Sequence, residues 1–380
     1  MFDFDTIHNR RGTCSLKWNG REGEIPLWVA DMDFVAAPAI LQALQRRVQH
    51  GIFGYNVLPK AYYESIIAWW AQYHQYHIQK EWIVFCNGIV PAIASIIRHC
   101  TNKGAKILVQ TPVYHAFFRC IEANGREVLE SPLYYENGSY AIDFVALERD
   151  LQQPDVQMMI LCNPHNPIGK VWNRDELATI GRLCAKHNVL LLSDEIHCDL
   201  LESGQTHTPM ALVQSAPIIT TLSASKAFNL AGLQGAFCVL EDSQLRERIS
   251  AAFAIDEINA PCAFSIDATI AAFSQSREWL VALNAYIAAN KNLVRQALKP
   301  LPVRVVGGEA TYMLWIETAK IANDSGKLCA DLRKHVGLYF SPGTQFRGNG
   351  RNFLRANLAL PQALLHEALE RFVGAILKYR

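Results

Sequence analysis

The chain has 380 residues, of which 50% are apolar and 19% are charged. This composition is ordinary for a soluble globular enzyme, and the length suits two domains better than one core. A formal net charge of +1 gives no global field that would attract nucleic acid or an anionic membrane, and we expect neither as a partner. The N-terminus has no apolar signal core, and no apolar run is long enough to span a bilayer, so we expect a cytoplasmic protein.

Six short apolar runs, several of them separated by amphipathic stretches, lie between about residues 83 and 240. The runs cover residues 83–85, 107–109, 158–161, 189–192, 218–222 and 236–240. Because they are continuous rather than alternating, both faces of the resulting sheet should be covered. The pattern predicts an α/β domain with a mostly parallel sheet flanked by helices, in which ligands bind beyond the carboxyl ends of the strands.

The C-terminal part has a different pattern. It contains a long helical stretch at 278–298, a strand-like run at 311–316, a helical stretch near 328–336, a second strand-like run at 353–358 and a closing helix. We predict a large α/β domain at 43–270 and a smaller α+β domain formed by 1–42 and 271–380. The ten cysteines are scattered without a CxxC pair, so the usual zinc pattern is absent and we expect no metal.

A lysine, Lys226, follows the apolar run 218–222 almost directly, within the sequence TLSASK. Lysines are rarely buried without a partner. A desolvated lysine with a lowered pKa is a Schiff-base nucleophile. The alternative is a surface lysine at a strand end.

Two further polar residues follow apolar runs. Asp194 lies just after the apolar run 189–192, within the sequence VLLLSDE. A carboxylate there is costly unless it meets a cation or hydrogen-bond donors; it could equally be a helix N-cap. Asn166 lies in the sequence NPHNPIG, which forms a rigid turn and could present the amide to a ligand. A plain turn is the alternative.

The conjunction of these motifs is more specific than any one of them. They occur in the order Asn166, Asp194, Lys226, with intervals of 28 (194 − 166) and 32 (226 − 194) residues. Each interval holds about one strand–helix repeat. Here the sequence resembles the fold type I, aspartate-aminotransferase-like family of pyridoxal 5'-phosphate (PLP) enzymes over essentially the whole chain. The resemblance implies that Lys226 carries PLP, Asp194 pairs with its ring nitrogen and Asn166 donates to its ring oxygen.

The same resemblance assigns the remaining cofactor contacts. His197 stands where many relatives have a tyrosine facing the ring oxygen, although a histidine at a helix start would explain it equally. Tyr114 matches the aromatic residue that stacks on the cofactor. The phosphate is expected at a helix N-terminus and beside two hydroxyls, at Gly88, Ile89, Val90, Ser223 and Ser225. Many aminotransferases have a phosphate-binding arginine where this chain has Gln234, which puts that contact in doubt.

Substrate and partner contacts follow from the resemblance as well. Arg355 matches the arginine that binds the α-carboxylate of an amino-acid substrate, and a planar guanidinium suits that function. Tyr114 and Ala30 are expected near the substrate. Tyr55 matches a tyrosine that reaches the phosphate of the neighbouring subunit. We therefore expect a homodimer whose active sites are shared across subunits.

Local motifs indicate a branch of the family. The sequences LWVADMDF at 27–34, DEIH at 194–197 and AGLQ at 231–234 together look like the MalY/PatB branch of cystathionine and cysteine-S-conjugate β-lyases, in which Gln234 is expected. This resemblance implies cleavage of L-cystathionine or related cysteine S-conjugates to a thiol such as homocysteine, pyruvate and ammonia. Lys226 would remove the Cα proton.

Two other functions use the same features. An aminotransferase of amino acids would need the same lysine, aspartate and arginine, so only the branch resemblance favours elimination. A PLP-binding regulatory protein that acts through protein contacts is the second alternative. Because family sequence begins almost at the N-terminus, we expect no DNA-binding domain there. His74 and His77 could bind a metal from one helix face, although an amphipathic face explains them better.

Overall fold

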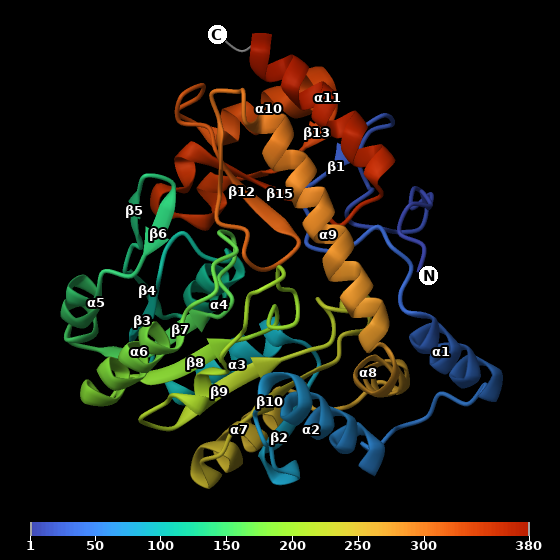
Figure 1. The fold of residues 1–380 in the computed structure, drawn as a ribbon. Helices are drawn as coiled ribbons and strands as arrows, with labels where there is room; N and C mark the ends of the chain where they lie inside the picture. Colours follow the sequence, from blue (N-terminus) through green and yellow to red (C-terminus); the bar gives the residue numbers. More distant parts are fainter. Residues whose placement is uncertain (1, 379–380) are drawn as a thin grey trace.

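The computed structural model describes residues 2–378, and a seven-stranded sheet forms its centre (Figure 1). The strand order is β2-β10-β9-β8-β7-β3-β4. Neighbouring strands are parallel except at β10, which is antiparallel to both β9 and β2. The predicted mostly parallel sheet is therefore confirmed. The strands are β2 (Ile83–Cys86), β3 (Lys106–Val109), β4 (Glu127–Glu130), β7 (Val156–Cys162), β8 (Leu190–Asp194), β9 (Ile218–Leu222) and β10 (Ala236–Val239).

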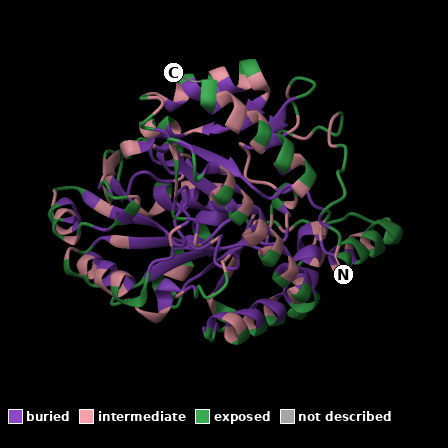
Figure 2. Ribbon diagram, turned by 45° about the horizontal axis from the view of Figure 1, so that its top comes forward, coloured by how far each residue is buried: buried purple, intermediate pink, exposed green. Residues whose placement is uncertain are grey.

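Helices cover both faces of this sheet, which explains its continuous apolar runs (Figure 2). Along β7, Met159 and Leu161 join one buried cluster, whereas Met158 and Ile160 join another on the opposite face. The first cluster includes residues of α2 (Lys60–His74), α6 (Arg174–Lys186) and α8 (Ala263–Gln275). The second includes residues of α3 (Ile89–Cys100), α4 (Ala116–Ala123) and α7 (Ser243–Ile255).

A second, antiparallel sheet lies above the first in Figure 1 and has the strand order β11-β12-β15-β14. Its strands are β11 (Arg304–Val306), β12 (Met313–Glu317), β14 (Ser341–Pro342) and β15 (Phe353–Asn357). The accompanying helices are α9 (Arg277–Leu298), α10 (Ser325–Val336) and α11 (Gln362–Lys378). The expected helices and strands of the C-terminal part are therefore present.

The N-terminal segment packs with this second sheet region. Its strand β1 (Ile25–Pro26) pairs in parallel with β13 (Leu338–Tyr339), and the segment continues into α1 (Pro38–His50), which packs on α8. The predicted boundaries at 42–43 and 270–271 fall inside α1 and α8, and the division into domains stays a prediction.

The remaining elements are α5 (Phe144–Leu151), β5 (Tyr134–Glu136), β6 (Ser139–Ala141) and the 3-10 helices η1 (Lys80–Trp82), η2 (Met210–Leu212), η3 (Ala231–Leu233), η4 (Gly343–Phe346) and η5 (Gly348–Asn352).

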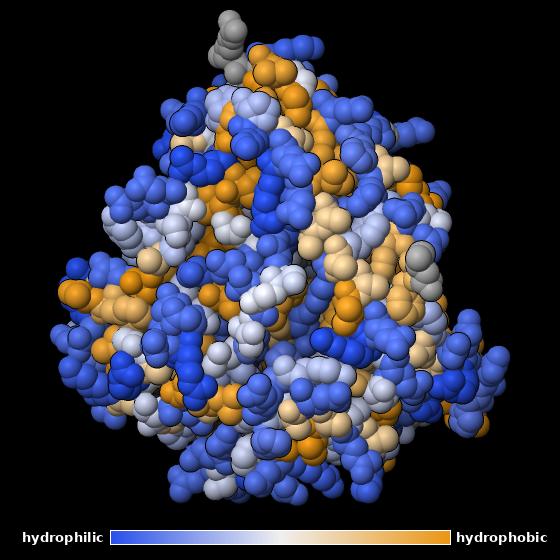
Figure 3. All heavy atoms as spheres, in the orientation of Figure 1, coloured by the Kyte–Doolittle hydropathy of each residue, from blue (hydrophilic) through white to orange (hydrophobic). Residues whose placement is uncertain are grey.

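The outer surface is mixed in character. Figure 3 shows hydrophilic residues over much of the visible face, with apolar residues exposed in smaller groups between them. Within residues 2–378, no helix has both the length and the apolar character needed to cross a membrane.

His74 is buried and bonded to Asp199, whereas His77 lies beyond the end of α2 and is exposed. The two histidines therefore do not share a helix face.

The two sheet regions meet where the turn after β7 contacts the segment before β12. The Gly308 amide donates to the Ile168 carbonyl at 3.0 Å, and the Ala310 amide donates to the Gly169 carbonyl at 2.8 Å. Gly307 has a φ of +64°, and a Cβ there would lie 2.1 Å from the Ile168 carbonyl oxygen. Only glycine tolerates both the backbone conformation and this contact.

Gly307→Ala should therefore destabilise the protein by about 2 kcal/mol or more, since the left-handed conformation alone costs about 1–2 kcal/mol. Urea unfolding would measure the change. Gly374→Ala in α11 is the matched control, because a Cβ there meets nothing within 4 Å and should stabilise the helix by about 0.5–1 kcal/mol. A Gly307→Ala variant as stable as the parent protein would contradict the close approach.

Candidate active site

A cavity of about 260 Å³ lies at the carboxyl edge of the large sheet. Because β10 is antiparallel to both neighbours, β2 runs in the same direction as β9, and the segments that follow β2, β3, β7, β8 and β9 converge on this edge. Such an edge is the usual ligand site of α/β sheets. Eleven of the predicted site residues line the cavity: Ala30, Gly88, Ile89, Val90, Tyr114, Asn166, Asp194, His197, Ser223, Ser225 and Lys226.

Lys226 reaches the cavity from the turn that follows β9. Its Nζ donates a hydrogen bond to the Ala30 carbonyl at 2.7 Å. Burial and the positive charge of Arg355 lower the pKa of Lys226 to about 8, although Asp31 and Asp194 act in the opposite direction. An amine with this pKa is partly neutral near pH 7.5, as a nucleophile or a base must be.

Asp194 is the last residue of β8 and is buried. Burial raises its pKa to about 7, although hydrogen bonds from the Ile196 amide and the Thr221 hydroxyl, both 3.3 Å long, oppose this change. A cationic group in the cavity would favour the ionised carboxylate. The site therefore suits a ligand that carries a protonated ring nitrogen.

Arg355 is on β15 of the smaller sheet and adjoins the cavity through Asn166. Its guanidinium donates to Asn166 Oδ1 at 3.1 Å and to the Trp28 carbonyl at 2.8 Å, while its buried Nε has no partner. Burial lowers the pKa of Arg355 to about 10, so it stays charged at neutral pH. The hydrogen-bond acceptors that it meets among residues 2–378, on Asn166, Trp28 and Ser341, are all neutral, which leaves its charge able to bind an anionic ligand.

The N-terminus of α3 faces the same cavity. Its N-cap, Gly88, has a φ of +113° and no side-chain cap, so the amides of Ile89 and Val90 have no capping partner. Free amides at a helix N-terminus bind phosphate. On the other side, Ser223 donates to the Gly235 carbonyl at 2.7 Å and accepts from the Ser225 amide at 3.0 Å.

Histidine and tyrosine side chains complete the lining. Burial lowers the pKa of His197 to about 3, and its Nδ1 is buried without a partner. A neutral imidazole of this kind can still exchange a hydrogen bond with a ligand. Burial also raises the pKa of Tyr114, which keeps its phenol protonated.

Several lining residues were not predicted, and two predicted residues are not part of the lining: Arg355, which adjoins the cavity, and Tyr55. The additional lining residues include Asn87, Pro91, Cys162, Ile196, Ala231 and Gly235, which flank the predicted ones, together with Gln234. Tyr312 on the approach to β12 donates to the Ala30 carbonyl at 2.8 Å, but in the run TYMLWI it looks like an ordinary core tyrosine. Tyr55 is fully exposed outside the cavity, and its contact with a partner stays a prediction.

Comparison with known proteins agrees with this geometry. The profile of the family "Aminotransferase class I and II" matches residues 24–372. The chain belongs to that family. The predicted family resemblance and fold class are therefore confirmed.

Full-length relatives are similar to this chain. It is 37% identical to cystathionine β-lyase PatB of Bacillus subtilis, over 98% of this chain and 100% of that one. It is 31% identical to protein MalY of Escherichia coli, over 99% of both. The solved structure of a PLP-bound C-S lyase from Staphylococcus hominis matches with a TM-score of 0.94 and 32% identity, over 99% of this chain and 98% of that one.

His197 should make the protein more sensitive to acid. Its pKa of about 3 in the folded chain lies below the ordinary value of about 6.5, so between these values the unfolded chain binds a proton that the folded chain does not. Stability due to this residue is therefore complete above about pH 6.5 and falls as the pH decreases. In the cofactor-free chain, His197→Asn should reduce the loss of stability between pH 6 and pH 5 by about 1 kcal/mol.

Urea unfolding at both pH values would measure this difference. Above about pH 8, where a histidine is neutral in both states, the stabilities of the two proteins should differ by a constant amount. Equal slopes between pH 6 and pH 5 would mean that the folded imidazole is protonated normally.

Proposed function

We propose that this chain is a PLP-dependent carbon–sulfur β-lyase that acts on L-cystathionine or related cysteine S-conjugates. The single observation that carries the proposal is the convergence of Lys226, Asp194 and Arg355 around one cavity. The similarity to PatB and to the S. hominis C-S lyase supports elimination over transfer of the amino group. A cytoplasmic location, expected from the sequence, belongs to this proposal.

The chemistry of the cavity fits PLP. The buried carboxyl of Asp194 and the buried Nδ1 of His197 both lack a strong partner, and the α3 N-terminus has uncapped amides. We infer that Lys226 holds the cofactor covalently, that Asp194 faces its ring nitrogen and that Asn166 and His197 face its ring oxygen. Tyr114 would stack on the ring, and the phosphate would lie at Gly88, Ile89, Val90, Ser223 and Ser225.

The proposed reaction begins with binding of the substrate carboxylate by Arg355, whose charged N–H groups suit a bidentate contact. PLP, when bound, supplies an electron sink that stabilises negative charge at the substrate Cα. The substrate's own amine would replace Lys226 on the cofactor, and the neutral amine of Lys226 released in this way takes the Cα proton. The electron pair left at Cα forms the Cα–Cβ double bond as the C–S bond breaks and the thiolate leaves. The released aminoacrylate hydrolyses to pyruvate and ammonia.

A direct assay separates elimination from transamination. The purified holoenzyme should release pyruvate steadily from L-cystathionine with no keto acid added, and Lys226→Ala should abolish the release because no other cavity amine can take the proton. Pyruvate is measured with a coupled dehydrogenase, and a parallel reaction contains α-ketoglutarate as amino acceptor. Amino transfer that depends on the keto acid, without pyruvate, would instead identify an aminotransferase.

The homodimer is the second part of the proposal. Tyr55 lies in the segment between α1 and α2, where Ile52, Phe53 and Val57 are also largely exposed. Exposed apolar residues gathered in one segment are typical of a contact surface. We infer that this segment contacts a second copy of the chain and that Tyr55 reaches the phosphate in the partner's cavity.

Mixed dimers would test this arrangement. Lys226→Ala and Tyr55→Asp should each be nearly inactive alone, because one lacks the base and the other repels the phosphate. Co-expression should restore about a quarter of the parent activity, since random pairing makes half of the dimers mixed and each mixed dimer has one intact site. Activity no higher than the average of the two single variants would mean that each site is built from one chain.

A further inference from the structure

The segment at residues 28–32 supplies backbone acceptors to the two cations of the site. The Ala30 carbonyl accepts from Lys226 Nζ at 2.7 Å and from the Tyr312 hydroxyl at 2.8 Å. The Trp28 carbonyl accepts from Arg355 at 2.8 Å. This segment is neither helix nor strand, so no regular hydrogen-bond ladder fixes these carbonyls and other contacts must do so.

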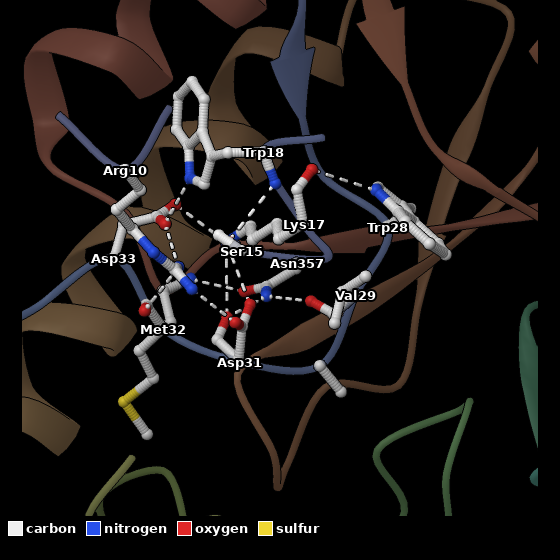
Figure 4. Close-up of polar contacts among 12 residues, drawn as sticks. Arg10, Ser15, Lys17, Trp18, Trp28, Val29, Asp31, Met32, Asp33 and Asn357 are labelled. Carbon is white, nitrogen blue, oxygen red and sulfur yellow. Dashed lines mark hydrogen bonds and ion pairs between the residues drawn. The ribbon is translucent and has the colours of Figure 1, made fainter. Parts of the chain in front are cut away.

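A buried ion pair anchors the C-terminal end of the segment (Figure 4). Lys17 Nζ lies 2.7 Å from Asp33 Oδ2 and 3.2 Å from the Asp31 carbonyl oxygen, and its side chain is 0% exposed. The other oxygen of Asp33 accepts from Trp18 Nε1 at 2.7 Å and from Arg10 at 2.6 Å. The chain therefore cannot move at residues 31–33 without exposing or separating these charges.

Two asparagines also hold the segment. The amide of Asn357 donates to the carbonyls of Val29 and Asp31, which flank Ala30. The side chain of Asn229 accepts from the Met32 amide at 3.0 Å and donates to the Met32 carbonyl at 3.2 Å. Asn229 follows Lys226 by three residues and Asn357 follows Arg355 by two. Each segment that carries a cation thus also binds the segment that accepts its hydrogen bond.

We propose that Lys17 and Asp33 are positioning residues of the active site, whose buried ion pair fixes the Ala30 carbonyl as the acceptor for the Lys226 amine whenever that amine is free. This inference rests on the proposed role of Lys226. A buried ion pair is often replaceable by apolar residues without loss of stability, so stability alone does not account for it. The bond from Lys17 to the Asp31 carbonyl, next to Ala30, gives the ion pair a second function, which is to hold this backbone in place.

The Ala30 carbonyl controls the direction in which the lone pair of the Lys226 nitrogen points. Once one N–H of Lys226 is donated to it, the lone pair of the neutral amine points away from the carbonyl. When the amine takes a proton, the same bond becomes charge-assisted and therefore stronger. The charged and titratable groups that act on this amine are Arg355, Asp31 and Asp194, and His197 and Tyr312 lie beside it.

The test compares holoenzyme variants with a matched control. Lys17→Met removes the anchor, and the double variant Lys17→Met/Asp33→Asn removes both charges so that neither is left buried and unpaired. The control is Glu24→Gln, because Glu24 is a buried carboxylate of the same N-terminal region that pairs with Arg333 at 2.9 Å and does not contact residues 28–33. Three quantities are measured: kcat and KM for L-cystathionine, the thermal unfolding midpoint, and an absorbance midpoint. The last is the midpoint of the pH dependence with which visible absorbance develops when PLP is added to the cofactor-free chain, in which the Lys226 amine is free.

Both Lys17 variants should lose about tenfold or more in kcat, since misplacement of a reacting group by about 1 Å can cost about a hundredfold. KM should change less than kcat, and the absorbance midpoint should move. Glu24→Gln should change only the unfolding midpoint. If the double variant keeps the parent kcat and absorbance midpoint, the ion pair is structural and the proposal is wrong. If the parent releases no pyruvate, the proposed activity fails, whereas the absorbance titration still decides the positioning role.

Discussion

The site depends on one constraint: three ionisable side chains are buried there without forming an ion pair with one another. They are Lys226, Asp194 and Arg355. Burial is the largest influence on each: it lowers the pKa of Lys226 to about 8, raises that of Asp194 to about 7 and lowers that of Arg355 to about 10. All three changes favour the neutral form. A ligand that brings an acidic ring nitrogen and a carboxylate would reverse this penalty, which is why the cavity suits one chemical class of ligand.

The two sheets are needed because these groups come from different parts of the fold. Asp194 ends β8 and Lys226 follows β9 of the large sheet, whereas Arg355 lies on β15 of the smaller one. The N-terminal segment passes between them, and its carbonyls accept from both Lys226 and Arg355. The pairing of β1 with β13 fixes this segment to the smaller sheet, so the relative position of the sheets sets the distance between the cations.

Sequence patterns predicted the elements with strong local signals. Strands β2, β7 and β9 were found because continuous apolar runs mark strands buried on both faces, but β4 (Glu127–Glu130) was missed because it is a half-exposed edge strand that begins and ends with glutamate. Asn166, Asp194 and Lys226 were singled out because each follows an apolar run within a few residues, and the resemblance to a known family then gave them their roles.

The contacts that were missed depend on long-range packing. Lys17 meets Asp33 from an irregular segment, and Tyr312 meets the Ala30 carbonyl across 282 residues. No periodicity marks such pairs, because only the tertiary fold brings them together. Tyr55 is a different case: the family resemblance predicts its contact with a neighbouring subunit, and this prediction depends on a second chain.

The glutamine at position 234 is consistent with the same electrostatic constraint. Gln234 and Lys226 line one cavity of about 260 Å³, and the charge of Arg355 already lowers the pKa of Lys226. An arginine at position 234 would add another positive charge near this amine and lower its pKa further, because like charges disfavour the protonated form. The uncapped amides of α3 offer a phosphate neutral donors instead. A neutral residue at position 234 therefore lets the chain bind an anion while the lysine keeps a pKa close to physiological pH.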